Sequence, residues 1–409
     1  MSINQFFLFS FHAVLFVCGL GLLVPCLMVF VECTAALLPF SEENTKENIL
    51  ENIQNAKVAV LVPAHNEELV IRTTLMDLKN KLQKGYKLIV VVDNCTDATA
   101  EISRTVGATV IERNDINKRG KGYALDYGLE FLKQEPPEVV VFIDADCFVG
   151  QGTMEKLVQL AIATKRPVQA TYLMSKPGLP SPKDSVSAFA FKVKNQVRLL
   201  GLKKLGLPCT LVGTGMAFPW SAISSVNLAN GDIVEDMKLG LDLNMAGYPP
   251  LFCASALVTG CLPQQVQAAK TQRTRWEHGH LQTLLTYVPK LIKTSVKKKR
   301  FDLFVSAMDL CVPPLSLLVS VWLLMMGTSL LVAFMGIGYS AILIGTAGWF
   351  LMVAILTAWV KFGRKELPLL QLLSIPIYIF NKIPVYLQFI FKPVKIWVRT
   401  ERDSINNPF

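Results

Sequence analysis

Two long stretches of uncharged residues constrain the fold of this chain most strongly. Residues 5–31 and 310–360 contain no Asp, Glu, Lys or Arg. About 20 apolar residues let a helix cross the hydrocarbon core of a bilayer. The second stretch is too long for one helix, and residues 336–340 predict a turn near its middle. We therefore expect three membrane-spanning helices.

A cleaved signal peptide is the alternative for the first stretch. Such a peptide has a basic segment before a short apolar core. No basic segment precedes this stretch, and the apolar run is longer than such a core. We therefore expect residues 1–39 to be a retained N-terminal anchor.

The charges support a membrane protein with a cytoplasmic soluble part. Only 18% of the 409 residues are charged, below the roughly 25% of soluble domains. The net charge is +10, and basic residues flank the apolar stretches, which marks the cytoplasmic side. These residues are Lys293, Lys297, Lys298, Lys299, Arg300, Lys361, Arg364, Lys365, Lys392, Lys395, Arg399 and Arg402. Since they follow membrane edges and not one soluble face, we expect no nucleic-acid partner. Nine cysteines without metal-type spacing indicate reduced thiols.

Apolar β-branched runs alternate with helix-compatible segments between the two stretches. The strand-like runs are 58–62, 88–92, 109–111 and 139–143, and the helix-compatible segments are 68–84, 97–106 and 123–133. This alternation predicts a parallel sheet covered by helices on both faces. Ligands bind beyond the carboxyl ends of such strands. Polar residues stand at those ends, namely His65, Asn66, Glu67, Asp93, Asn94, Asp144 and Asp146.

The remaining segments are less regular. Residues 189–205 predict either an amphipathic helix at the membrane surface or a solvated basic helix. Residues 264–293 predict one or two helices that lead to the bilayer. Residues 367–391 are apolar but interrupted by prolines and by Asn381–Lys382, so we expect interfacial or re-entrant helices. The predicted domains are an anchor (1–39), a catalytic domain (40–260), interfacial helices (261–302), two transmembrane helices (303–361) and interfacial helices with a basic tail (362–409).

Asp144 and Asp146 are the strongest candidates for a metal site. They follow a buried strand and are two residues apart, which places both carboxylates on one side of an extended segment. Two carboxylates can hold Mg²⁺ or Mn²⁺ while a diphosphate completes the coordination. The alternative is a strand-end turn with two solvated Asp residues.

Three other strand-end or loop features are candidates for nucleotide binding. Asp93 can accept hydrogen bonds from a base or a ribose, although it can also cap a helix. Glu67 can line the same crevice or belong to a turn. Lys121 lies in a basic, Gly-rich loop, residues 117–122, ahead of a predicted helix. Cations and free backbone N–H groups at a helix start bind phosphate.

Two motifs farther along supply candidates for the chemistry. Glu235 and Asp236 open a helical stretch, and either could be a general base; acidic residues are also common in a first helical turn. Gln272, Arg275 and Trp276 share one helix face. An Arg on that face suits a diphosphate leaving group, whereas a Trp with a snorkelling Arg at a membrane surface is the alternative.

Together these residues resemble the family-two inverting glycosyltransferases that include cellulose and hyaluronan synthases, and they are also similar to ceramide glucosyltransferases. Four elements match in order: Asp93, the D-x-D pair Asp144 and Asp146, the E-D pair Glu235 and Asp236, and the Q-x-x-R-W motif of Gln272, Arg275 and Trp276. The resemblance implies a GT-A fold, an α/β Rossmann-like mixed sheet, plus transmembrane helices. It implies Asp236 as the base, with Glu235 beside it, and Asp144 and Asp146 as metal ligands. It assigns Glu67, Asp93, Lys121, Asp144, Gln272, Arg275 and Trp276 to the nucleotide sugar.

The resemblance implies a hexosyltransferase-type enzyme that moves a sugar from a UDP-linked donor, with Mg²⁺ or Mn²⁺, to a lipid-linked or saccharide acceptor in polysaccharide or oligosaccharide biosynthesis. We expect an integral protein of a bacterial inner membrane, with polysaccharide export partners as an option. Three spans make a polymer channel in one chain doubtful. The alternatives are a glycolipid synthase acting on a lipid alcohol and a non-catalytic transporter subunit. A transporter predicts ionisable residues inside its spans, and residues 310–360 have none.

Overall fold

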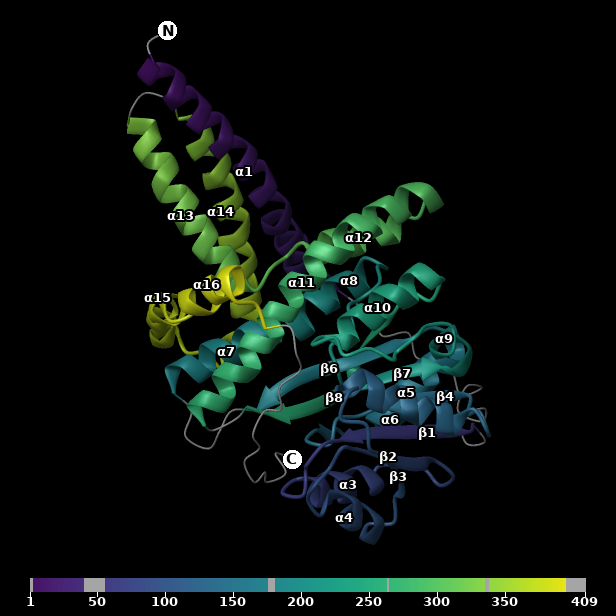
Figure 1. The fold of residues 1–409 in the computed structure, drawn as a ribbon. Helices are drawn as coiled ribbons and strands as arrows, with labels where there is room; N and C mark the ends of the chain where they lie inside the picture. The colour runs from purple at the N-terminus through teal and green to yellow at the C-terminus, as the bar shows by residue number, and fades with distance from the viewer. Residues whose placement is uncertain (1–2, 40–55, 176–180, 263–264, 335–337, 395–409) are drawn as a thin grey trace.

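The computed structural model describes residues 3–39, 56–175, 181–262, 265–334 and 338–394. Long apolar helices form a bundle at one end of the molecule, and an α/β domain lies at the other end (Figure 1). Residues 40–55, the first two residues of the predicted turn (336–337), and the basic residues Lys395, Arg399 and Arg402 lie outside the described residues.

The α/β domain is built on one mixed eight-stranded sheet in the order β3-β2-β1-β4-β7-β6-β8-β5. The first four strands run parallel, and β7 is antiparallel to both β4 and β6. The mixed sheet confirms the predicted fold class, whereas an entirely parallel sheet is wrong beyond β4. The strands are β1 (Val58–Ala64), β2 (Lys87–Asp93), β3 (Thr109–Arg113), β4 (Val139–Phe142), β5 (Phe148–Val149), β6 (Val168–Ser175), β7 (Met216–Pro219) and β8 (Leu251–Cys261).

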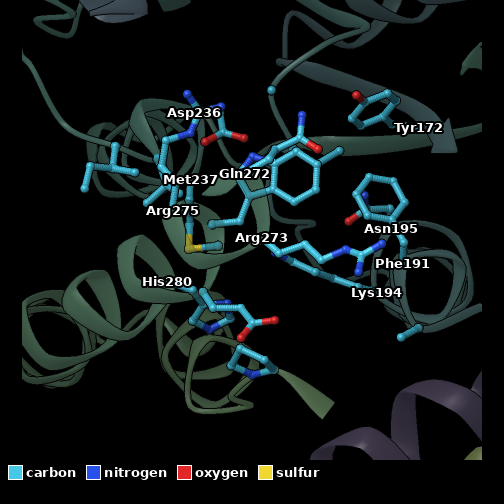
Figure 2. Close-up of a pocket in the computed structure, with 18 of the residues that line it drawn as sticks. Tyr172, Phe191, Lys194, Asn195, Asp236, Met237, Gln272, Arg273, Arg275 and His280 are labelled. Carbon is cyan, nitrogen blue, oxygen red and sulfur yellow. The ribbon is translucent and has the colours of Figure 1, made fainter. Parts of the chain in front are cut away.

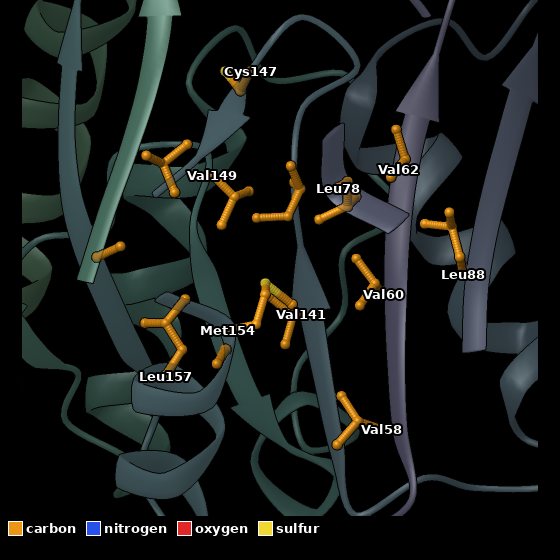
Figure 3. Packing of buried hydrophobic residues seen from close by; sticks show 14 of the residues in the cluster. Val58, Val60, Val62, Leu78, Leu88, Val141, Cys147, Val149, Met154 and Leu157 are labelled. Carbon is orange, nitrogen blue, oxygen red and sulfur yellow. The ribbon is translucent and has the colours of Figure 1, made fainter. Parts of the chain in front are cut away.

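Helices cover both faces of this sheet because alternate side chains of the central strands point to opposite sides. Val58, Val60 and Val62 of β1 pack in one cluster with α3 (Ile71–Lys79) and α6 (Thr153–Thr164) (Figure 3). The intervening β1 residues pack on the other face. The helices there are α5 (Lys121–Leu132), α9 (Trp220–Ile223) and α10 (Glu235–Ala246). The shorter α4 (Thr99–Thr105) precedes β3.

The apolar bundle consists of α1 (Ile3–Ala35), α13 (Leu315–Phe334) and α14 (Tyr339–Ala358), which pack side by side (Figure 1). Each is long and apolar enough to cross a membrane. A fourth stretch, Leu369–Phe391, also meets this criterion of length and composition. A short π-helix, η2 (Trp359–Gly363), continues α14.

The fourth stretch is broken into η3 (Leu369–Ser374), α15 (Ile375–Phe380) and α16 (Ile383–Phe391). The break at Asn381–Lys382 was predicted from the sequence, and it leaves no straight helix of spanning length. These helices lie across the lower end of the bundle, beside the α/β domain (Figure 1). Their placement at a membrane surface stays a prediction.

A continuous helical run connects the bundle to the domain. It comprises α7 (Pro182–Lys192), the π-helix η1 (Val193–Arg198) and α8 (Leu199–Lys204). Its apolar residues pack against α1 and α14. The solvated-helix alternative is wrong at Arg198, which is 6% exposed. Arg198 pairs with Glu32 of α1 and with Asp309 of α12 (Phe301–Leu310).

One long helix, α11 (Val266–Lys298), follows β8. Of the one or two helices expected from residues 264–293, the structure has one, which extends five residues farther. It packs against α12 and α10, and Tyr287 of α11 donates hydrogen bonds to the Asp242 carboxylate of α10. This packing places the Q-x-x-R-W face of α11 beside the start of α10.

Candidate active site

A cavity of about 240 Å³ lies between the carboxyl edge of the sheet, α10, α11 and the η1 segment. It is lined by Asp144, Asp146, Lys121, Glu235, Asp236, Gln272, Arg275 and Trp276. Thus eight of the ten residues predicted for the site surround one space. Figure 2 shows two sides of it: Asp236, Met237 and Arg275 lie on one side, and Phe191, Lys194 and Asn195 lie on the other.

The D-x-D pair stands just beyond β4, where the strand's hydrogen bonds end. Potential ligand atoms of Asp144, Asp146 and Cys147 lie within 4.8 Å of one another. The Asp144 backbone N–H donates to Thr214 Oγ1 at 3.0 Å, which fixes the start of the turn. Burial raises the pKa of the Cys147 thiol well above its ordinary value. Because Mg²⁺ and Mn²⁺ prefer oxygen to sulfur ligands, the two carboxylates are the donors in this group that suit these ions, and their role as metal ligands stays a prediction.

This donor set fits Mg²⁺ or Mn²⁺. Both ions prefer oxygen ligands, and both accept substrate oxygens as additional ligands. The paired carboxylates border the cavity and do not fill it. Asp144 and Asp146 are thus the residues that would hold such an ion.

Lys121 lies at the first residue of α5 and connects three parts of the site. Its ammonium pairs with Asp144, approaches Glu235 Oε1 at 3.8 Å and donates to the Gly213 carbonyl at 2.7 Å. Burial opposes its charge, but Asp144 and Glu235 more than offset this, so the Lys121 pKa is raised. Lys121 therefore stays a cation in the pH range of proteins.

Gly213 allows the loop backbone to lie close to Asp236 and Lys121. Its φ is +99°, a left-handed conformation that favours glycine. A Cβ there would lie 3.2 Å from Asp236 Oδ2 and 3.9 Å from Lys121 Nζ. The loop that holds Asp144 in place therefore also borders Asp236.

Glu235 and Asp236 begin α10, as the sequence predicts. Burial raises the pKa of Glu235 to about 7, although Lys121 opposes this shift. The two neighbouring carboxyls thus differ in their surroundings. A carboxylate that lines a cavity can accept a proton from a hydroxyl bound there, and Asp236 is among the lining residues.

Gln272, Arg275 and Trp276 face the cavity from α11, which confirms that they share one helix face. Gln272 is 5% exposed, and its Oε1 has no hydrogen-bond partner in the structure. The Trp276 ring contacts the Phe191 ring, with centroids 5.8 Å apart. The next residue, Glu277, pairs with Lys382 between α15 and α16. The broken helices are therefore tied directly to the Q-x-x-R-W segment.

Asp93 and Glu67 lie outside this cavity lining. Asp93 ends β2, is 5% exposed and pairs with Arg113 at 2.6 Å. Burial raises the Asp93 pKa, although Arg113 opposes the shift. Glu67 is 7% exposed in the turn after β1, where its backbone N–H donates to Thr99 Oγ1. Their predicted role in nucleotide binding stays a prediction.

The cavity wall opposite α10 was not predicted from the sequence. Tyr172 of β6 and the helical residues Phe191, Lys194, Asn195 and Arg198 line it. Burial lowers the pKa of Lys194. No motif marks these residues. The only signal was the periodic placement of basic residues in 189–205, which indicated a helix but not its partner.

The cavity also reaches the bundle. Pro313, Pro314, Leu315 and Ser316, where α13 begins, belong to its lining. Tyr378 and Lys382 of the broken helices complete this end. One continuous space therefore connects the acidic residues to the base of the apolar helices.

A comparison with protein families shows the family to which this chain belongs. The model described as "Glycosyltransferase like family 2" matches residues 55–279, more than half of the chain. The chain belongs to glycosyltransferase family 2. The matched region contains every predicted site residue, from Glu67 to Trp276. This membership confirms the resemblance drawn from the motifs and leaves the transporter alternative without support.

Two curated proteins illustrate the relationship of this glycosyltransferase to others. It is 26% identical over 294 residues to a probable glycosyltransferase, YdaM, of Bacillus subtilis, covering 65% of this chain and 64% of that protein. It is 23% identical over 279 residues to the poly-beta-1,6-N-acetyl-D-glucosamine synthase of Staphylococcus epidermidis, covering 62% and 61%. The glycosyltransferase thus spans less than two thirds of these relatives' lengths.

The fold of the glycosyltransferase is similar to that of a solved enzyme. The mannosyltransferase PcManGT from Pyrobaculum calidifontis, in complex with GDP-Man and Mn²⁺, matches with a TM-score of 0.51 at 18% identity. The match covers 87% of this chain and 98% of that one. At this identity the likeness concerns the fold alone, and it agrees with the predicted GT-A class.

Proposed function

We propose that this enzyme transfers a sugar from a UDP-linked donor to a membrane-associated acceptor in polysaccharide or oligosaccharide biosynthesis. The observation that carries the proposal is the single cavity. It joins Asp144, Asp236 and Arg275 at one end to the first residues of α13 at the other. The residues suited to the donor and an opening toward the apolar bundle therefore belong to one cavity.

The donor would bind at the acidic end of the cavity. Asp144 and Asp146 would hold Mg²⁺ or Mn²⁺, which offsets negative charge on a diphosphate. Lys121 and Arg275 add two cations on the same lining. A guanidinium suits phosphate because its planar N–H groups can donate in pairs. These residues position the donor and stabilise the leaving nucleoside diphosphate.

The transfer is a single displacement at the anomeric carbon. Asp236 takes the proton of the acceptor hydroxyl while that oxygen forms a bond to the carbon. The bond from this carbon to the diphosphate oxygen breaks, and the electron pair leaves with the nucleotide. Glu235, with its raised pKa, can remain neutral beside Asp236 and so avoids a second negative charge. One displacement inverts the anomeric configuration.

The membrane role rests on the apolar helices and the flanking charges. Three packed helices and a broken fourth stretch have the length and composition of membrane segments. Basic residues after α11 and α14 lie on the side of the α/β domain, which supports a cytoplasmic domain by the positive-inside rule. A bacterial inner membrane is the location we propose.

The test uses the purified full-length protein in nanodiscs of bacterial lipids. A panel of UDP- and GDP-sugars is supplied with Mn²⁺, and nucleoside diphosphate release is measured. We expect release with one UDP-sugar and loss of release with a chelator. No release from any donor, in the presence of total lipid and oligosaccharide extracts, would contradict the proposal.

A glycolipid synthase is the second candidate, favoured by the Pro313–Ser316 end of the cavity. A sugar-labelled donor separates the two candidates because the product is either a saccharide linkage or a sugar on a lipid alcohol. Mass spectrometry of the labelled product identifies the newly formed bond.

A further inference from the structure

The short helix α12 carries an exposed aromatic pair. Phe301 is 70% exposed and Phe304 is 40% exposed, and their rings stack with centroids 6.2 Å apart. They are three residues apart and so share one face of the helix. Leu303, Ala307 and Leu310 are buried and pack in one cluster with residues of α10 and α11. Large apolar side chains that stay exposed together indicate a surface with a binding partner.

A run of basic residues directly precedes this pair. Lys297, Lys298 and Lys299 are all exposed at the end of α11. The ammonium groups of Lys297 and Lys299 have no hydrogen-bond or ion-pair partner in the part of the chain that the structure describes. The acidic residue that follows, Asp302, is already paired with Arg300. Positive charge therefore stands next to the exposed rings without an acidic group of this chain to balance it.

The position of α12 relative to the apolar bundle indicates what this surface meets. Only residues 311–314 separate α12 from α13, which is long and apolar enough to cross a membrane. At the end of α12, Asp309 pairs with Arg198, which also pairs with Glu32 near the end of α1. From this end of the bundle α12 extends to one side (Figure 1). A bilayer around the bundle would have its surface at this level.

The chemistry of the surface fits anionic phospholipids. Apolar side chains of a helix that lies on a membrane enter the boundary between headgroups and acyl chains. Lysines beside them are attracted to the negative charge of an anionic leaflet. A zwitterionic leaflet would accept the rings but would not offer that attraction. A soluble acidic protein could pair with the lysines, but it would have to bind at the level where the bilayer begins.

We propose that Phe301, Phe304 and the lysines at 297–299 form a surface that docks on the anionic phospholipids of the leaflet next to the α/β domain. The rings enter the headgroup boundary, and the ammonium groups pair with lipid phosphates. This surface lies at the end of α11, the helix that carries Arg275 near its start. Anionic lipid thus holds the helix of the candidate active site at the bilayer. The inference rests on the proposed membrane location and not on the transfer reaction.

Hydrogen–deuterium exchange of the full-length protein, followed by mass spectrometry, tests this docking. The protein is placed in nanodiscs of phosphatidylcholine alone, of phosphatidylcholine mixed with phosphatidylglycerol, or of phosphatidylcholine with soluble polyglutamate added. The main variant combines Lys297→Gln with Lys299→Gln. The matched control combines Lys84→Gln with Lys165→Gln, because both are exposed lysines of the α/β domain without an ion pair among the described residues. Unchanged exchange in β1 checks that each variant is folded.

We expect the amides of residues 296–304 to exchange at least about fivefold more slowly with phosphatidylglycerol than without it, in the wild type and in the control. The reason is that each lysine near an anionic surface raises the docked population by about fivefold. The Lys297 and Lys299 variant should lose this difference, and high salt should remove it from the wild type. Replacing Phe301 and Phe304 together by Gln should speed exchange in both lipids.

Two outcomes would overturn the docking surface. One is equal exchange of the wild type in the two lipids, or equal slowing in the wild type and in the lysine variant. The other is slowing by polyglutamate and not by phosphatidylglycerol, which would indicate an acidic protein partner. Because no donor is present in this experiment, a protein that shows the lipid effect but consumes no donor would contradict the proposed transfer alone.

Discussion

The buried pairing of Arg198 with two carboxylates gives a quantitative prediction for Arg198→Met. The Arg198 side chain is 7% exposed, that of Glu32 is 0% and that of Asp309 is 11%. Arg198 Nη2 lies 2.5 Å from Asp309 Oδ1. These three residues join α1, η1 and α12, so the substitution leaves two carboxylates buried together at the junction of the bundle and the domain.

Removing one partner of a buried ion pair costs about 3–5 kcal/mol. We expect the free energy of unfolding to fall by at least about 3 kcal/mol in Arg198→Met at pH 7. Burial opposes ionisation of Asp309, but Arg198 more than offsets this and lowers its pKa. A lowered carboxyl pKa stabilises the folded state above the unfolded pKa, and this contribution is lost as the pH falls through the folded value. The difference between the proteins should therefore shrink in acid.

Unfolding in detergent micelles, followed by circular dichroism against denaturant, measures this difference. Arg104→Met is the matched control, because Arg104 pairs with Glu112 and both are about half exposed. An exposed pair contributes under about 1 kcal/mol. Replacing Glu32, Arg198 and Asp309 together by apolar residues should restore much of the loss. Equal destabilisation by Arg198→Met and Arg104→Met would refute the reasoning.

Three further results are expected. Gly201→Ala should destabilise the protein more than Gly327→Ala in thermal unfolding, because a Cβ at Gly201 would lie 1.9 Å from a backbone carbonyl oxygen of α1, whereas nothing lies within 4 Å at Gly327. Burial raises the Glu235 pKa from 4.5 to about 7, so its contribution to the free energy of unfolding is full below pH 4.5 and is lost as the pH rises through 7. The thermal unfolding midpoint of the wild type should therefore decline over this pH range, and Glu235→Gln should abolish the part of the decline that Glu235 causes. An unchanged decline in Glu235→Gln would contradict this prediction. Asp146→Asn should raise the Mn²⁺ concentration for half-maximal donor binding by about tenfold or more, while Cys147→Ser should leave it unchanged; the reverse order would remove Asp146 from the metal site.

Residues at strand ends and helix starts were predictable because local chemistry determines their position. Asp144 follows an apolar strand, Lys121 begins a helix after a Gly-rich loop, and Asp236 lies in the first turn of α10. The i, i+3, i+4 spacing placed Gln272, Arg275 and Trp276 on one face in the same way. A parallel arrangement of the first strands then brought the early motifs to one edge of the sheet.

The opposite wall of the site was not predictable because it depends on contacts between distant segments. The register of the helical run around Asn195 changes at a π-helical turn that has no sequence signature. The Glu277–Lys382 pair joins residues 105 positions apart. The sequence alone suggests that Arg198 is a surface cation, whereas the packing of α1 and α12 around it buries its side chain. Packing between segments that are distant in the sequence determines such pairs, and the residue periodicity of a single segment does not predict them.

The proposed transfer chemistry is tested most directly by Asp236→Asn. Donor affinity is measured by calorimetry with Mn²⁺ and the UDP-sugar that the panel identifies, and transfer is measured with the same donor. Loss of a general base lowers the rate by about 10²–10⁴-fold. We expect donor affinity close to that of the wild type and a transfer rate reduced by at least about 100-fold. Transfer at the wild-type rate would contradict the assignment of the base.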